Sequence, residues 1–202
     1  MTSIRNVLPV SLLLLLAAVA SAQVLEIGPQ FGVNRLSNSM LYQNPTSPDL
    51  YAKLNSGFRF GFRVTLNAYE YAGHEVGYAY NRTNFDCPGC GLTQPLGMAT
   101  HQGFYDFLLY ARPEGSKIRP FIAGGAQFSN FVPPGSSVSY GSGEMKFGIN
   151  YGGGIKVRTS DRFLIRLDFH QYLSPKPDFN FPTAPNGWLR LNEISAGFSY
   201  TM

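Results

Sequence analysis

The last nine residues of the chain alternate between apolar and polar side chains up to the final residue. One face would carry Ile194, Ala196, Phe198, Tyr200 and Met202, and the other Ser195, Gly197, Ser199 and Thr201. A period of two is typical of a β-strand with one apolar face. Such a strand needs a partner along its edge, because unpaired backbone groups are a liability. We expect it to pair with the first strand of the chain and so close a barrel.

Seven earlier segments show the same alternation, so that eight strands are expected. Together with the closing segment, the eight expected strands are residues 24–33, 57–68, 74–83, 100–111, 118–128, 146–158, 162–173 and 189–202. The second segment is the clearest, because Phe58, Phe60 and Phe62 alternate with Arg59, Gly61 and Arg63. The facing of segment 118–128 stays open, since Gly and Ala dominate it. No segment keeps a 3.6-residue apolar period over the length of a helix, and the sequence therefore predicts an all-β domain.

The connections between these segments alternate between long and short. The long ones are residues 34–56, 84–99, 129–145 and 174–188, and the short ones are 69–73, 112–117 and 159–161. Tight turns at one end and longer loops at the other are typical of a transmembrane barrel. The sequence therefore predicts an eight-stranded antiparallel up-and-down transmembrane β-barrel.

The size of the alternating residues indicates which face points outward. The apolar sets consist of bulky Phe, Tyr, Leu and Ile, whereas the polar sets are rich in Gly, Ser and Asn. An eight-stranded barrel has an interior just wide enough for side chains to fill, so the small polar sets suit the inside. Only 14% of the residues are charged, against about 25% in typical soluble domains. These features favour a lipid-facing outer wall over a soluble barrel.

Charged residues on the small-residue face are then lumen residues. By alternation these are Glu26, Arg59, Arg63, Glu75, Asp106, Lys156, Arg158, Arg166, Asp168 and Glu193, five of each sign. Buried charges persist when they are paired and hydrogen-bonded, and neighbours on one face lie about 5 Å apart. We expect a ladder of ion pairs that fills the barrel. The alternative is a polar conduit or ion pathway.

The N-terminus has the features of a secretory signal peptide. Arg5 precedes an apolar run over residues 12–20, which is followed by the small residues Ala20, Ser21 and Ala22. This pattern predicts a signal peptide of residues 1–22 that is cleaved before Gln23. The apolar run is shorter than the roughly 20 residues that a spanning helix needs. The remaining residues, 23–202, suit a single domain.

The two cysteines, Cys87 and Cys90, frame a Pro-Gly pair in one of the long connections. In an exported chain they are expected to form a disulfide that staples the loop. A thioredoxin-like redox role requires a βαβ setting, and a zinc site requires further ligands. We therefore expect no metal or other cofactor. The cations behind the net charge of +4 are scattered, so no nucleic-acid partner is expected.

The chain resembles the small barrel-only outer-membrane proteins of the OmpA/OmpX type. Segments 119–126 and 152–168 and the closing strand carry the resemblance. It implies a location in the bacterial outer membrane, with membrane lipid and the barrel-insertion machinery as partners. In such proteins the final strand is the insertion signal, which maps here onto Phe198, Tyr200 and Met202. That signal usually ends on an aromatic residue, whereas this chain ends on Met202. We expect no peptidoglycan-binding module after it.

Function is less constrained than fold. We expect a structural or interaction protein that meets a ligand through its extracellular loops, because function in such scaffolds sits on loops. Aromatic residues of the loops are candidates for this contact or for packing on the barrel rim: Tyr42, Tyr51, Tyr140, Phe179 and Phe181. The alternative is a narrow or side-opening pore for small solutes. A lipid-modifying enzyme is less favoured, because the one hint of a catalytic arrangement is His170 near Asp168, and both residues point into the lumen by alternation.

Overall fold

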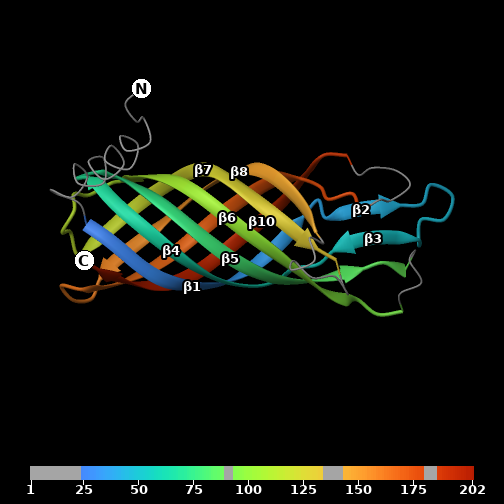
Figure 1. The fold of residues 1–202 in the computed structure, drawn as a ribbon, viewed down its shortest axis with the longest axis horizontal. Helices are drawn as coiled ribbons and strands as arrows, with labels where there is room; N and C mark the ends of the chain where they lie inside the picture. The colour runs from blue at the N-terminus through green and yellow to red at the C-terminus, as the bar shows by residue number, and fades with distance from the viewer. Residues whose placement is uncertain (1–23, 89–92, 134–142, 180–185) are drawn as a thin grey trace, which may run out of the picture.

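The structure, a computed structural model, describes residues 24–88, 93–133, 143–179 and 186–202. Ten strands form one antiparallel sheet that closes on itself (Figure 1). They are β1 (Val24–Ser37), β2 (Met40–Gln43), β3 (Tyr51–Leu54), β4 (Gly57–Tyr69), β5 (Ala72–Asp86), β6 (Leu96–Tyr110), β7 (Ile118–Val132), β8 (Glu144–Arg158), β9 (Phe163–Pro175) and β10 (Trp188–Thr201). None of the described residues belongs to a helix long and apolar enough to cross a membrane.

Eight of these strands form the barrel, in the order β1, β4, β5, β6, β7, β8, β9 and β10. The seam between the first and last strands runs from the pair Glu26 and Thr201 to the pair Ser37 and Arg190. Its end is tied by Met202, whose amide donates to the carbonyl of Leu25 over 2.8 Å. This arrangement confirms the predicted eight-stranded antiparallel barrel and the pairing of the closing strand with the first one.

The seam also requires a glycine. A Cβ on Gly28 would lie 1.8 Å from the carbonyl oxygen of Phe198 on the neighbouring strand. The next residue, Pro29, has no amide hydrogen to donate across the seam. The backbones of β1 and β10 therefore lie too close together at Gly28 for any residue with a side chain.

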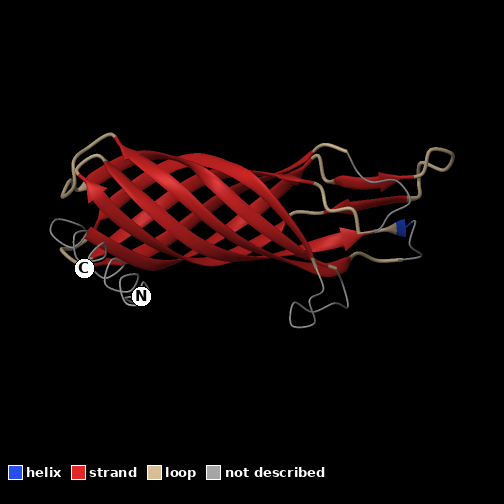
Figure 2. Ribbon diagram, turned by 45° about the horizontal axis from the view of Figure 1, so that its top comes forward, coloured by secondary structure: helices blue, strands red, loops and turns tan. Residues whose placement is uncertain are grey.

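The strands extend further toward the loops than the alternation predicted, and the first long connection is not a plain loop. It contains the hairpin β2–β3, and β3 pairs with the extended end of β5 through Lys53 with Asp86 and Leu54 with Phe85. The hairpin projects beyond the barrel (Figure 2). The reason is that β5 continues past the barrel and offers a free edge that a short strand can pair with.

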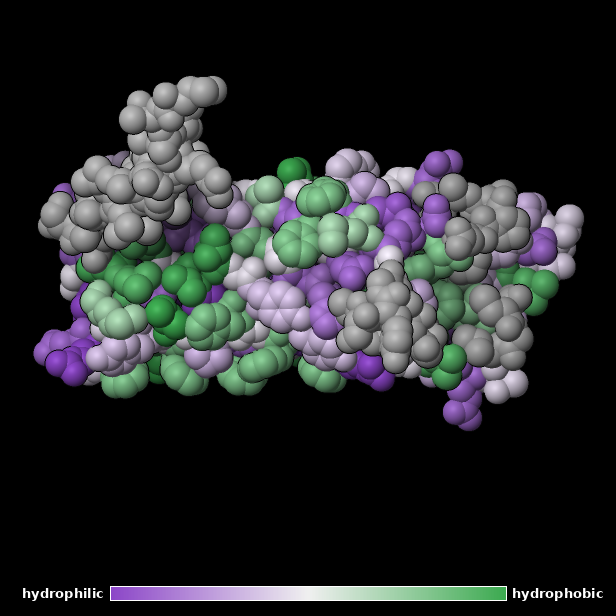
Figure 3. All heavy atoms as spheres, viewed as in Figure 1, coloured by the Kyte–Doolittle hydropathy of each residue, from purple (hydrophilic) through white to green (hydrophobic). Residues whose placement is uncertain are grey.

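The outer face of the barrel is apolar and the inner face is polar, as the sizes of their residues indicate. The outer wall carries exposed rings such as Phe58, Phe60 and Phe62, and apolar side chains gather over the barrel surface (Figure 3). The inner face buries polar and charged side chains. The predicted signal peptide, residues 1–22, lies outside the described residues.

Candidate functional site

The centre of the lumen holds a compact cluster of two arginines and two carboxylates, which we call the central ion cluster: Arg63, Glu75, Arg166 and Asp168. Arg166 donates two hydrogen bonds to Glu75 and one, of 2.6 Å, to Asp168. Arg63 pairs with Asp168 over 3.0 Å and lies 3.9 Å from Glu75. All four side chains are at most 4% exposed. The charges balance within the cluster, as buried charges must if they are to stay ionised.

A second polar group lies toward the turn end of the barrel. Lys156 pairs with Glu26 over 2.5 Å and donates to the hydroxyl of Tyr110 over 2.9 Å. Asn67 connects the two, because it donates to Glu26 and accepts from the hydroxyl of Tyr110. The guanidinium of Arg119 stacks 3.4 Å from the centre of the Tyr110 ring. This group occupies the lumen on the turn side.

A third polar group lies between the central ion cluster and the loops, around Arg59. This arginine pairs with Glu193 over 2.8 Å and donates to Gln102 and to the hydroxyl of Tyr172. Its guanidinium also stacks 4.7 Å from the centre of the Tyr172 ring, which in turn packs edge-on against Phe104. Beside this group an enclosed cavity between Gln102, Gln127 and Tyr172 measures about 10 Å³. It has room for roughly one water molecule.

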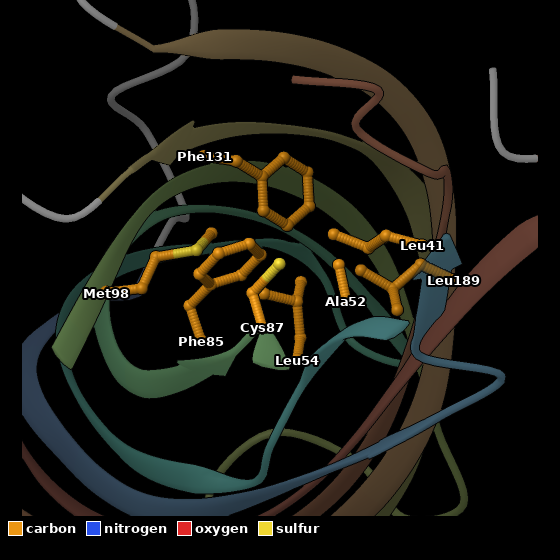
Figure 4. Packing of buried hydrophobic residues seen from close by; sticks show 8 residues of the cluster. All are labelled: Leu41, Ala52, Leu54, Phe85, Cys87, Met98, Phe131 and Leu189. Atoms are coloured by element: carbon orange, nitrogen blue, oxygen red, sulfur yellow. The ribbon is translucent and has the colours of Figure 1, made fainter. Parts of the chain in front are cut away.

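An apolar cluster closes the lumen at the loop end, and we call it the cap: Leu41, Ala52, Leu54, Phe85, Cys87, Met98, Phe131 and Leu189. Figure 4 shows these side chains turned toward one another across the mouth of the barrel. Phe179 packs on the cap through an edge-on contact with Phe85. The hairpin β2–β3 contributes three of the cap residues, so the cap also holds the hairpin in place.

Lys176 ties the segment after β9 to the hairpin, and Cys87 is a disulfide-bonded member of the cap. Lys176 follows β9 and donates from Nζ to the carbonyl of Met40, over 2.7 Å. Burial lowers the pKa of its ammonium group. Cys87 is buried and disulfide-bonded. Cys90, the other cysteine of the chain, lies outside the described residues.

The tip of the hairpin, residues 44–50, is exposed and ordered by its own hydrogen bonds. The side-chain oxygen of Asn44 accepts from the amide of Thr46 over 2.9 Å and from the amide of Ser47 over 3.2 Å. The backbone of Asn44 and Leu50 closes the base of the tip over 2.9 Å. An asparagine that bonds the backbone two residues ahead pre-forms a turn, so the tip has a defined shape.

The structure places nine of the ten predicted lumen charges inside the barrel, with side chains buried: Glu26, Arg59, Arg63, Glu75, Asp106, Lys156, Arg166, Asp168 and Glu193. Arg158 lies at the turn-end mouth instead, is 27% exposed and pairs with Glu114. Asp106 joins no arginine directly and accepts from Asn150 over 2.5 Å. Phe198, Tyr200 and Met202 lie exposed on the outer wall, and their role in insertion stays a prediction.

The sequence predictions did not include two of the lumen residues, Tyr110 and Arg119. Tyr110 shares the phase of Asp106 on β6, and its buried side chain points inward. Arg119 was left out because the facing of its segment was open, and the buried alternation of Phe121 and Ala123 resolves it. Of the loop aromatics, Tyr42 and Phe179 pack on the cap and Tyr51 contacts Asp86. Tyr140 and Phe181 lie outside the described residues.

The three histidines are not arranged for nucleophilic catalysis. His74 and His101 lie on the outer wall, hydrogen-bonded to Tyr105 and Tyr78. His170 lies in the lumen, and its ring nitrogens are 4.0 Å from the nearest carboxylate oxygens of Asp106 and Asp168. This separation is too long for a hydrogen bond, so neither carboxylate orients the ring as in a catalytic triad.

Comparisons with known proteins agree with this geometry. The sequence model of the family described as outer membrane protein beta-barrel domain matches residues 10–201. The outer membrane protein OprG of Pseudomonas aeruginosa superposes with a TM-score of 0.61 at 13% identity, covering 90% of this chain and 96% of that one. Neisserial surface protein A has a TM-score of 0.56 at 11% identity, with coverages of 90% and 100%.

A third solved structure is that of Ail, the attachment invasion locus protein of Yersinia pestis, crystallised with the heparin analogue sucrose octasulfate. It has a TM-score of 0.52 at 13% identity, with coverages of 90% and 100%. A comparison with curated proteins found no significant match. At these identities the structural likeness concerns the fold.

Proposed function

Because the chain belongs to the family of outer membrane protein beta-barrel domains, we propose that it acts as an integral outer-membrane interaction protein, through the surface at its loop end. The observation that carries the proposal is the contrast between a filled lumen and an ordered, exposed hairpin tip. Three polar groups and the apolar cap fill the barrel along its length. The tip, by contrast, projects furthest from the barrel (Figure 1).

The filled lumen supports a role that does not depend on conduction. Apart from Asp106, its buried charged side chains are held by ion pairs, and opening a path for water would break several of these pairs together. A cavity of about 10 Å³ is too small to hold a solute. The cap adds an apolar barrier at the loop end.

The hairpin tip supports binding to a partner. A pre-formed loop loses less conformational freedom when it binds than a disordered one does. The tip, residues 44–50, contains no Lys or Arg and one acidic residue, Asp49. Its chemistry therefore suits the neutral, hydrogen-bonding surface of a protein better than a sulfated saccharide such as the heparin analogue in the Ail structure.

Replacing residues 44–50 by a Gly-Ser segment of equal length is expected to lower surface binding by at least about tenfold. Vesicles carrying the purified protein would be assayed on immobilised extracellular-matrix proteins and on a heparin surface. Arg112→Gln, an exposed change at the turn end, is the matched control and should bind as the wild type does. Equal binding by the tip replacement and the wild type on every surface would contradict the proposal.

Planar-bilayer recordings separate this function from the pore alternative. We expect the wild-type protein to give silent membranes, because the lumen is filled. Reproducible conductance steps would contradict the proposal and favour a narrow pore.

We also propose that residues 1–22 are a signal peptide that is removed on export. Mass spectrometry of protein extracted from outer membranes should give a mature N-terminus at Gln23. Ala22→Tyr places a large side chain next to the cleavage site and should leave the unprocessed chain. A mature protein that retains residues 1–22 would contradict this assignment.

A further inference from the structure

A row of polar side chains crosses the outer wall of the barrel near the loop end: Tyr151, Gln171, Asn192 and Arg35. They come from β8, β9, β10 and β1 and are register partners across the four strands. The hydroxyl of Tyr151 donates to Gln171, whose amide donates to Asn192 over 2.6 Å. On the turn side of the row the same face is apolar, with Val33, Ile194 and Phe169.

Two arginines lie at this row with no acidic partner. Arg35 pairs in register with Asn192, and Arg190 lies two residues before Asn192 on the same face. The Cα atoms of such diagonal neighbours on adjacent strands are about 7–8 Å apart. Both arginines are exposed, and neither forms an ion pair with any residue that the structure describes. The outer wall therefore carries two neighbouring arginines without an acidic partner where its apolar surface ends.

A groove opens on the wall beside Arg190. It has a volume of about 310 Å³ and is lined by Ile149, Tyr151, Gln171, Leu173, Trp188 and Arg190. Its lining combines the apolar side chains of Ile149 and Leu173 with the amide and hydroxyl groups of the row. Trp188 is half exposed at the loop end of the groove. Tryptophan at this level is typical of the membrane interface.

We propose that this part of the wall binds a phosphorylated lipid of the leaflet at the loop end. The phosphate group lies between Arg35 and Arg190, because guanidinium groups hold phosphate oxygens through paired hydrogen bonds. An acyl chain lies in the groove against Ile149 and Leu173. Gln171 and Asn192 meet the polar linkage between the phosphate and the chain.

Charge and location both favour a lipid over other occupants. The groove opens on the lipid-facing wall, so its occupant shares the bilayer with the protein. A second copy of this chain would bring its own two arginines against these two, and like charges repel. The lipid site also lies on the wall and not on the hairpin tip, so it does not depend on the proposed loop-end function.

The single tryptophan of the chain, Trp188, allows a direct binding measurement. The refolded mature protein in mixed micelles would be titrated with diphosphorylated lipid A while the Trp188 emission is followed. Lipid A from which both phosphates have been removed serves as the ligand control. We expect saturable binding of the phosphorylated lipid, and binding at least about tenfold weaker for the dephosphorylated one.

Arg35→Gln combined with Arg190→Gln should weaken binding of the phosphorylated lipid at least about tenfold. The matched control is Arg82→Gln, which removes an exposed arginine from the same end of the wall, on β5. It should change the affinity less than about twofold. Each variant is first checked for the gel mobility shift on heating that marks a folded barrel.

Three results would overturn the proposal. Equal loss of affinity in Arg82→Gln would mean that diffuse positive charge attracts the lipid. Equal binding of the dephosphorylated lipid would mean that the acyl chains suffice. Full displacement by millimolar inorganic phosphate would mean that the arginines form a site for the free anion.

Discussion

Replacing Arg166 by methionine is expected to destabilise the barrel by about 3–5 kcal/mol, because it leaves two buried carboxylates without their main partner. Arg166 is 1% exposed and bonds both Glu75 and Asp168. Arg63 alone would then face both acids, and one of them would have to take up a proton or stay uncompensated. The measurement is the free energy of unfolding in urea, with the protein refolded in lipid vesicles.

The control is a compensated double variant, Arg166→Met with Glu75→Gln. It removes one charge of each sign, and replacing a buried pair by neutral groups is often close to neutral. We expect it to regain most of the stability that the single variant loses. Arg162→Met, at an exposed position of the turn end, should stay within about 0.5 kcal/mol of the wild type. A single variant as stable as the wild type would mean that the central ion cluster does not hold the lumen together.

Alternation with a period of two carried most of the fold prediction, because the barrel wall is two-sided along every strand. The size difference between the two faces identified the lumen, since a whole row of bulky side chains such as Phe58 and Phe60 would overfill the interior of eight strands. Once it is known which residues of a strand point inward, counting along the strand in steps of two assigns a charged residue such as Glu193 to the lumen. The same rule places Tyr110 inside, although tyrosine is common at membrane interfaces.

Pairing partners beyond the bilayer could not be predicted in the same way. Residues 51–54 have the burial pattern of a strand but are too short for a periodic signal, and their pairing depends on how far β5 extends. The cap likewise brings together Leu41, Met98 and Leu189 from distant parts of the chain. Contacts of this kind follow from the three-dimensional closure of the barrel, and no local pattern encodes them.

Replacing Phe131 by alanine is expected to loosen the cap and release the hairpin β2–β3 while the barrel stays folded. Phe131 is 3% exposed and packs within the cap. Truncating a buried phenylalanine to alanine costs about 3–5 kcal/mol. This cost falls on the part of the fold with the fewest connections to the barrel, where local opening is least expensive. Apart from the cap, the hairpin is joined to the barrel by two register pairs of β3 with β5 and by the hydrogen bond from Lys176 to Met40.

Lys53 provides the measurement, because it is the one tryptic site between residues 40 and 54. It is paired with Asp86 in the closed hairpin, so cleavage after it reports opening. When opening is fast relative to cleavage, the rate follows the population of the open form. A local loss of about 3 kcal/mol raises that population by roughly a hundredfold, and the cleavage rate should rise by the same factor.

Phe128→Ala is the matched control, because Phe128 lies three residues away on β7 but points outward, over Gly103. It removes the same ring without touching the cap, so cleavage after Lys53 should stay at the wild-type rate. An unchanged rate in Phe131→Ala would mean that backbone pairing alone holds the hairpin. Loss of the folded barrel in that variant would mean that the cap and the barrel unfold as one unit. Release of the hairpin with an intact barrel is therefore the one result that fits a cap acting as a separate clamp.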